Sequence, residues 1–348
     1  MYLTVAFGFV FGLLLAIARV NRNSVIAGMA TLEDFRVAKT MAAAIAVGTV
    51  LIALLVVSGA ASYEIKPLLV GGIVYGGLLF GAGMAILGYC PGTLTISLGQ
   101  GAVDAGIGAL GGLLGGLAFT AAKPALDPFL GQDLGPQSLY GMMEPFPFAY
   151  LLVCLVFGVV VGGLALLLHR LEKATGYLWL YAGAGLGVLN AVMILPETAD
   201  RLIGASTAFP FIADRVVGLT DNDYYRRIEA PGSWEMWFLL GAFLAGLAYA
   251  LVRHEFRWQL TSSHWRKYHG QDGGKRVFWA FLGGFILLFG ARMAGGCTSG
   301  HILSGSMQLA SSGLIFAVVV FIAFLVTGKL FYRSPGSAGS GAASGRPI

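Results

Sequence analysis

The sequence is short of charged residues. Asp, Glu, Lys and Arg make up only 11% of its 348 residues, whereas 57% are hydrophobic. A chain with so little polar surface cannot cover a soluble globule. The formal net charge of +5 does not indicate nucleic-acid binding, because the Lys and Arg residues fall in short loops of the kind that membranes sort to the cytoplasm. The composition predicts an all-α integral membrane protein, in which the 52 glycines allow close helix packing.

Metal-ligand patterns and nucleotide-binding motifs are also missing. The three cysteines have no ligand spacing, and His254, His264 and His269 share one polar loop away from them. Disulfide frameworks, zinc sites and iron–sulfur clusters are therefore not expected, and neither is a haem or quinone site, which needs paired axial ligands. No P-loop is present, which argues against ATP coupling within the chain. We predict no cofactor.

Long apolar stretches dominate the remaining sequence. The first has no cationic region before it, so we interpret it as a retained helix rather than a cleaved signal peptide. Crossing a bilayer takes about 17–25 apolar residues. Two pieces, 92–100 and 299–310, are too short to cross and are predicted to be re-entrant half-helices. The stretches predicted to cross are about nine, at 2–18, 40–61, 68–88, 101–122, 147–168, 177–195, 236–252, 277–295 and 312–332.

Loop charges predict the orientation of these spans. Lys and Arg dominate the loops at 19–39 and 253–276 and the end of the last span, whereas acids dominate 123–146 and 196–235. Basic loops stay in the cytoplasm, so we predict a multi-pass inner-membrane protein with its N-terminus outside and its C-terminus inside. The predicted organisation is one transmembrane domain, 1–333, with repeat units at about 1–123 and 177–333, a linking helix at 147–168, and a disordered tail at 334–348.

One short motif occurs twice. Phe80-Gly-Ala-Gly-Met-Ala leads to Cys90-Pro-Gly-Thr, and Phe289-Gly-Ala-Arg-Met-Ala leads to Cys297-Thr-Ser-Gly-His. The predicted topology sends the span before Cys90 inward and the span before Cys297 outward, so the repeat is inverted. Inverted repeats with broken helices place a transport site near the membrane midplane. We therefore expect the two cysteines to face one pathway from opposite sides.

The residues around the two cysteines are candidates for this pathway. Pro91 suits the first turn of a helix, so Cys90 should stand at a half-helix N-terminus, which attracts anions and lowers a thiol pKa. Cys297 occupies a similar break, whereas Cys154 lies in an unbroken apolar run and is assigned to packing. The predicted pathway residues are Cys90, Pro91, Gly92, Thr93, Ser97, Gln100, Arg292, Cys297, Thr298, Ser299, Gly300, His301, Ser304 and Gln308.

When the charged residues are assigned to loops, and Glu64 and Lys66 to a tight turn, two remain in or beside the predicted spans. These two are Asp104 and Arg292. Ionisable residues in membranes are functional hypotheses by default. Arg292 offers a forked donor to an oxyanion, the alternatives being that it snorkels to an interface or pairs with Asp104. Asp104 is expected to cap its helix or neutralise its positive end.

Three polar side chains of the motifs have open alternatives. Ser97 and Ser304 each follow a cysteine by seven residues, which indicates a shared role. They either donate to a ligand or bond back to carbonyls of their own helices. His301 is either a proton donor or ligand near Cys297, or merely hydrogen-bonded.

The two cysteine segments resemble the signatures of the YeeE/YedE family of sulfur-transport membrane proteins. The resemblance covers both repeat units and implies uptake of a sulfur-containing anion, typically thiosulfate, with the motif cysteines acting on the substrate. Some relatives handle selenium or lie beside a small sulfur-carrier protein. Residues 1–20 contain no cysteine, so any relay uses at most the two motif thiols plus other donors.

The repeated cysteine motifs and the family resemblance together predict a permease, not an enzyme. Its predicted partners are thiosulfate or a similar sulfur oxyanion, the lipid bilayer and a small cytoplasmic sulfur carrier. No nucleic-acid partner is predicted. In the expected mechanism, the anion passes from Cys297 to Cys90. The alternative is a membrane sulfurtransferase that forms a persulfide on Cys90 or Cys297 and passes sulfur, or selenium, to a cytoplasmic carrier. A third possibility is a structural subunit, which would tolerate loss of both thiols.

Overall fold

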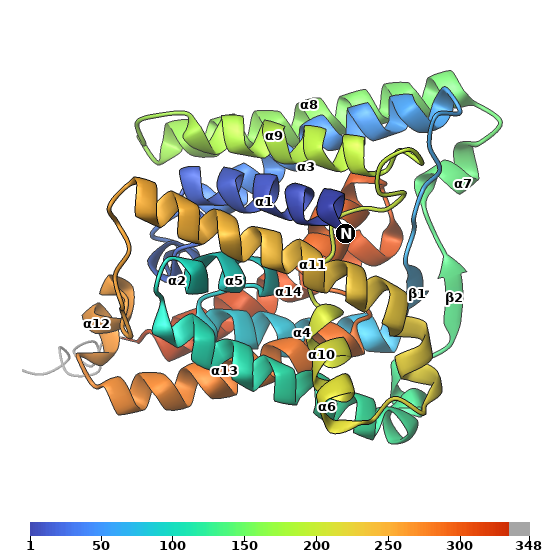
Figure 1. The fold of residues 1–348 in the computed structure, drawn as a ribbon. Coiled ribbons are helices and arrows are strands. Elements are labelled where there is room, and N and C mark those ends of the chain that lie inside the picture. The colour runs from blue at the N-terminus through green and yellow to red at the C-terminus, as the bar shows by residue number, and fades with distance from the viewer. Residues whose placement is uncertain (334–348) are drawn as a thin grey trace, which may run out of the picture.

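Helices dominate the computed structural model, which describes residues 1–333 (Figure 1). Each predicted span coincides with one apolar helix. These helices are α1 (Tyr2–Ile17), α3 (Arg36–Val57), α4 (Val70–Leu87), α6 (Val103–Leu130), α8 (Pro147–Leu171), α9 (Leu178–Met193), α11 (Asp223–Val252), α13 (Gly273–Met293) and α14 (Ser311–Phe331). The shorter elements are α2 (Asn23–Ala30), α5 (Pro91–Gly99), α7 (Leu139–Met143), α10 (Ala208–Val217), α12 (Ser263–His269), the π-helix η1 (Thr298–Gly305) and the antiparallel strands β1 (Pro67–Leu69) and β2 (Asp133–Pro136).

Seven helical stretches of the described chain are long and apolar enough to cross a membrane. This confirms the predicted all-α membrane protein. Helices α1 and α9 are apolar but have only 16 residues each, which at 1.5 Å per residue gives about 24 Å, less than the roughly 30 Å of a hydrocarbon core. The count of nine spans therefore stays a prediction. The predicted disordered tail, 334–348, lies outside the described residues.

Loops that were assigned to the same side of the membrane lie at the same end of the molecule. In Figure 1, α2 and α12 mark one end of the helix bundle, and β1, β2 and α7 mark the other. At the first end, Arg19 and Arg22 bind Glu255 at 3.0 and 2.6 Å, and Lys267 binds Glu33 at 2.9 Å. At the other end, β1 pairs with β2. Which membrane face each end meets stays a prediction.

Helices α4 and α13 pack against each other as an antiparallel pair. A Cβ atom on Gly72 would lie 2.6 Å from the Met293 carbonyl oxygen, and one on Gly83 would lie 2.5 Å from the Leu287 nitrogen. The two backbones therefore touch, which only glycine permits. Around this pair, α6 packs on α13, α14 on α4, α1 on α11 and α3 on α9. Because the pair is antiparallel, the Cys90 and Cys297 segments follow from opposite ends of it.

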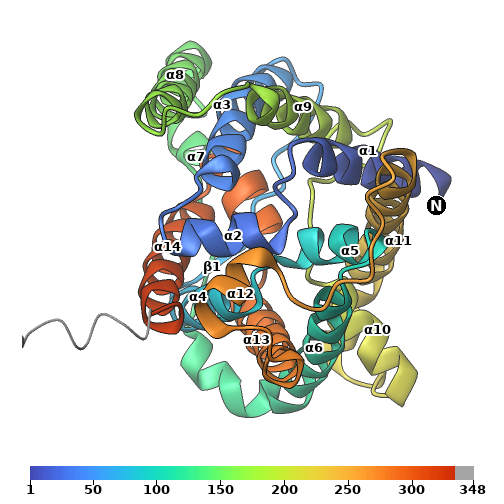
Figure 2. The same cartoon turned by 90° about the vertical axis from the view of Figure 1, so that its left-hand side faces the viewer.

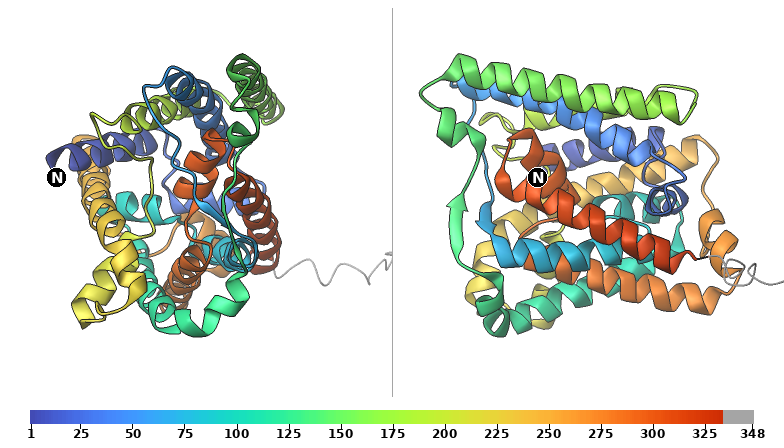
Figure 3. Two further views of the ribbon diagram at one scale, coloured as in Figure 1. Left: turned by 90° about the vertical axis from the view of Figure 1, so that its right-hand side faces the viewer. Right: turned by 180° about the vertical axis from the view of Figure 1, so that it is seen from behind.

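Helix α8 stands at the edge of the bundle, against α3 (Figures 2 and 3). Its Cys154 is 1% exposed and packs in a small cluster with Tyr150, Ala53 and Leu309. This position agrees with the packing role assigned to Cys154, since neither Cys90 nor Cys297 belongs to the cluster.

Asp104 forms a buried ion pair instead of capping its helix. The N-cap of α6 is Ala102, and Asp104 Oδ2 accepts hydrogen bonds from Arg276 Nη2 at 2.6 Å and Nε at 3.0 Å. Both side chains are almost fully buried. The capping prediction and the alternative pairing of Asp104 with Arg292 are therefore wrong. Charge counting placed Arg276 in a loop, but α13 begins at Gly273, so Arg276 belongs to the helix and faces inward.

Removing one partner of this pair is expected to destabilise the protein by about 3–5 kcal/mol, because the other charge is left buried and unpaired. The test compares the thermal midpoints of purified Arg276→Met and Lys275→Met proteins in detergent, since Lys275 is the exposed neighbour on the same helix turn. The double change Asp104→Asn with Arg276→Met is expected to recover part of the loss. Equal midpoints for the two single variants would contradict a stabilising pair.

Candidate functional site

The break before Cys90 is held by polar side chains from other elements. Helix α4 ends at Gly88, where φ is +76° and a Cβ atom would lie 2.1 Å from Asn23 Nδ2. The terminal carbonyl oxygen of Leu87 accepts from Arg276 Nη2 at 2.7 Å and from Asn23 Nδ2 at 2.8 Å, and that of Ile86 accepts from Arg276 Nη1 at 3.3 Å. These contacts satisfy carbonyls that a helix end leaves free, so α4 can stop inside the protein.

The break before Cys297 is held in the same manner. Beyond the end of α13, the Ala294 carbonyl oxygen accepts from His301 Nε2 at 2.9 Å, and the Gly295 carbonyl oxygen accepts from Lys66 Nζ at 3.2 Å. His301 thus makes a main-chain hydrogen bond, which agrees with the alternative that it is merely hydrogen-bonded. Lys66 was not among the predicted site residues, because it lies in a turn more than 200 residues earlier and no local pattern links it to Cys297.

Cys90 stands at the start of α5. It is the N-cap residue, and Pro91 occupies the first turn, both as the sequence predicts. The Cys90 backbone nitrogen donates to Thr93 Oγ1 at 2.9 Å, and Thr93 Oγ1 lies 3.3 Å from Cys90 Sγ. Gly92 leaves room for the Phe11 ring, 3.3 Å from where its Cβ would be. The half-buried thiol therefore lies at the positive end of a short helix.

Cys297 has the equivalent position before η1. Its backbone is extended, with φ at −129°, and its side chain is buried, with Sγ 3.1 Å from Ser299 Oγ. A Cβ atom on Gly300 would lie 2.7 Å from Lys66 Nζ, and one on Gly296 would lie at the same distance. Glycine at these two positions makes room for the Lys66 ammonium group beside the Cys297 segment.

One cavity of about 460 Å³ brings the two motifs together. Cys90 and Thr93 line it from α5, and Thr298 and Ser299 line it from η1. Most of the remaining lining is apolar and comes from α1, α2, α3, α9 and α14, including Phe11, Leu15, Met29, Leu186, Val320 and Phe324. Four predicted pathway residues from opposite halves of the chain therefore line one shared space.

Arg292 lies in a group of hydroxyls that we call the Arg292 cluster, formed by Arg292, Ser206, Thr207 and Tyr224. Its Nε donates to Tyr224 Oη at 2.7 Å, and its Nη1 donates to Ser206 Oγ at 3.2 Å and to Thr207 Oγ1 at 3.1 Å. The side chain is buried, and no ion pair within residues 1–333 includes it. The cluster thus holds a buried positive charge whose direct partners are neutral.

Two carboxyl groups lie around the Arg292 cluster. Glu235 Oε2 accepts from the Thr207 backbone nitrogen at 2.6 Å, and Asp214 Oδ2 on α10 accepts from Thr120 Oγ1 at 2.8 Å. Burial raises the pKa of Asp214 to about 6, while the hydrogen bond from Thr120 and the positive charge of Arg292 oppose that rise. Most of these residues come from the segment 196–235, for which the sequence predicts only an acidic outer loop.

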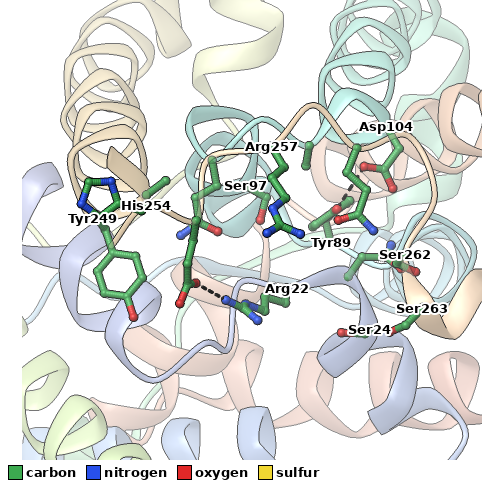
Figure 4. A pocket seen from close by; sticks show the side chains of 16 residues that line it. Arg22, Ser24, Tyr89, Ser97, Asp104, Tyr249, His254, Arg257, Ser262 and Ser263 are labelled. Carbon is green, nitrogen blue, oxygen red and sulfur yellow. Dashed lines mark hydrogen bonds and ion pairs between the residues drawn. The ribbon is translucent and has the colours of Figure 1, made fainter. Parts of the chain in front are cut away.

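Ser97 and Gln100 lie at the other end of α5, away from the cysteine cavity. Asn21 Nδ2 donates to Ser97 Oγ and to Gln100 Oε1, both at 2.9 Å, and Ser97 Oγ donates to the Asn21 carbonyl oxygen at 2.8 Å. Both residues line a second, polar pocket of about 360 Å³ beside Arg22 and Arg257 (Figure 4). The two ends of α5 therefore face two different spaces.

Ser304 and Gln308 make the corresponding contacts in the second motif. Ser304 Oγ donates to the Ile203 carbonyl oxygen at 3.0 Å, and Gln308 binds the main chain of Glu64 at 2.7 and 3.1 Å. Ser97 and Ser304 thus share a role, as their spacing indicates, but each bonds to a remote segment. The alternative in which they bond to carbonyls of their own helices is wrong, because both hydroxyls donate to main-chain carbonyls of remote segments.

The fold and the site together define a polytopic membrane transport protein with a thiol-bearing interior. The chain belongs to a family described as Sulphur transport, which matches residues 18–326. This confirms the family indicated by the two cysteine motifs. The chain is also 25% identical over 341 residues to a protein named Thiosulfate transporter TsuA from Spirochaeta thermophila, and the alignment covers 94% of this chain and 97% of that protein.

Proposed function

We propose that the protein takes up thiosulfate, or a closely related small sulfur oxyanion, across the inner membrane. The observation that carries this proposal is the Arg292 cluster, in which the side-chain hydrogen bonds of a buried guanidinium within residues 1–333 all go to hydroxyls. A buried charge is costly unless an opposite charge compensates it, and a bound anion would do so. The similarity to a protein named as a thiosulfate transporter supports this choice of anion.

The proposed path leads from the Arg292 cluster past Cys297 and Ser299, through the apolar cavity, to Cys90. Each thiol offers a weak S–H donor to the anion and is not consumed. Weak successive sites let an ion leave as readily as it enters. The apolar lining of the cavity suits the terminal sulfur of thiosulfate, because sulfur accepts weaker hydrogen bonds than oxygen and loses less on leaving water.

We infer that the path is enclosed by two inverted repeat units. One contains α1, α3, α4, α5 and α6, the other contains α9, α11, α13, η1 and α14, and α8 links them. Exchanging the units preserves the main helix contacts, since α6 packs on α13 as α14 packs on α4, and α1 packs on α11 as α9 packs on α3. In this arrangement nine spans place the N-terminus outside, and α5 and η1 enter as half-helices from opposite faces.

Uptake of doubly labelled thiosulfate into membrane vesicles tests the proposal. If the anion passes intact, both sulfur labels are expected inside in their starting ratio, and the mass of Cys90 and Cys297 stays unchanged. The sulfurtransferase alternative, with its cytoplasmic sulfur carrier, predicts that the two labels separate and that one cysteine gains the mass of a sulfur atom. Separated labels with a modified Cys90 or Cys297 would overturn intact uptake.

A further inference from the structure

The polar pocket of Figure 4 is built from several separate parts of the chain. It lies between the start of α2, Tyr89, the end of α5, the start of α6, the end of α11 and the segment 255–263. The side chains of Arg22 and Arg257 extend into the same space in the close view (Figure 4). Ser24, Ser263 and Tyr249 add hydroxyl groups to its lining, and hydroxyls readily donate to oxyanions.

The segment that carries Arg257 is fixed along the end of α5. The Gln259 backbone nitrogen donates to the Gly101 carbonyl oxygen at 3.0 Å, and the Val103 backbone nitrogen donates to the Gln259 carbonyl oxygen at 2.9 Å. Gly101 has φ at +95°, and a Cβ atom there would lie 2.5 Å from the Arg257 carbonyl oxygen. This close approach holds the Arg257 backbone beside Gln100, and both residues line the pocket.

The charges of the pocket do not balance. Glu255 binds both Arg19 and Arg22, at 3.0 and 2.6 Å, so one carboxylate serves two guanidinium groups. Asp104, the other acid in the lining, forms an ion pair with Arg276. Arg257 forms no ion pair within residues 1–333. The lining residues and their partners thus hold four arginines against two carboxylates, an excess of two positive charges.

We propose that this pocket binds a small divalent oxyanion, held by Arg257 and Arg22 and by the hydroxyls around them. An excess of two positive charges matches the charge of a dianion such as thiosulfate or sulfate, and guanidinium groups recognise oxyanions through paired N–H donors. In transport the pocket is the inner site, reached after Cys90 along α5. That direction rests on the proposed function, whereas the binding site itself does not.

Equilibrium binding of labelled thiosulfate to the purified full-length protein tests the site. Arg257→Gln is expected to weaken the affinity of this site at least tenfold, so that the protein loses about one bound anion per chain. Arg253→Gln is the matched control, because Arg253 is the C-cap residue of α11, four positions before Arg257, and does not line the pocket. If the Arg292 cluster also binds an anion, the number of thiosulfate ions bound per chain is expected to fall from about two to about one. If the cluster does not bind one, the number is expected to fall from about one to none.

Competition tests the charge preference of the same site. Sulfate is expected to displace the anion that depends on Arg257, and nitrate, which is monovalent, is expected to need at least a tenfold higher concentration. Equal stoichiometry in Arg257→Gln and Arg253→Gln would overturn the site, and so would nitrate competing as well as sulfate. Vesicle uptake measured in parallel separates the two proposals. If binding depends on Arg257 but vesicles take up no thiosulfate, the transport function is wrong and the binding site remains.

Discussion

Replacement of Arg292 by glutamine is expected to lower thiosulfate uptake by about a hundredfold. Glutamine keeps N–H donors for the hydroxyls of Ser206 and Thr207 but removes the charge that would attract a dianion. Losing one partner of a buried charged contact costs about 2–5 kcal/mol in binding, which corresponds to roughly thirtyfold or more. Arg292→Lys keeps the charge as a point without the planar fork, so an intermediate loss is expected. The measurement is the initial rate of labelled thiosulfate uptake into vesicles.

The control for this change is Arg226→Gln, since Arg226 is 69% exposed and lies two residues from Tyr224. It is expected to leave uptake unchanged. Arg292 also joins three hydroxyls, so the thermal midpoint of each purified variant must accompany the rate. Normal uptake by a folded Arg292→Gln protein would rule out the anion role. If Arg292→Lys folds normally but takes up thiosulfate no faster than Arg292→Gln, then uptake depends on the forked guanidinium contacts rather than on the positive charge.

Exchange of Cys297 for alanine is expected to lower uptake by about ten- to a hundredfold, because it removes the S–H donor and leaves Ser299 Oγ without its partner at 3.1 Å. A buried polar group left unsatisfied costs about 1–3 kcal/mol. Cys90→Ala should have a comparable effect through Thr93. The measurement is again vesicle uptake, with expression of each variant quantified in the same membranes.

The third cysteine of the chain provides the control for both thiols. Cys154→Ala changes a buried thiol that lies outside the shared cavity and is expected to retain full uptake. Serine at Cys297 or Cys90 distinguishes the mechanisms, because a hydroxyl can still donate a hydrogen bond but cannot form a persulfide. Partial uptake by the serine variants supports a hydrogen-bonding relay. Full uptake by both alanine variants would show that no thiol relay exists.

The long helices could be predicted from sequence because their signal is local. Runs of apolar residues mark α4 and α8 to within three residues at each end. Helix α11 was predicted from 236 but begins at Asp223, because its first turns carry charges and Pro231, which are not typical of a membrane span. The two breaks were visible for the same local reason, since glycine and proline interrupt each apolar run beside a cysteine.

The partners of the buried charges could not be predicted, because they join segments far apart in the chain. Arg276 reaches Asp104 across 172 positions and Lys66 reaches Gly295 across 229. A count of loop charges treats Arg276 as exposed, although its side chain is fully buried. The hydroxyls around Arg292 were missed for a similar reason. Ser206 and Thr207 are ordinary residues in a loop until the fold brings α13 against them.

The position of α5 has a consequence for the expected turnover rate of transport. Cys90 and Thr93 at its start face one space, and Ser97 and Gln100 at its end face another, with the Asn21 side chain bonded across that end. If anions pass from one space to the other as we propose, we expect each passage to need a local displacement of this helix or of Asn21. Such motions take microseconds to milliseconds, so we expect turnover of no more than about a thousand to a million ions per second, below that of a continuously open pore.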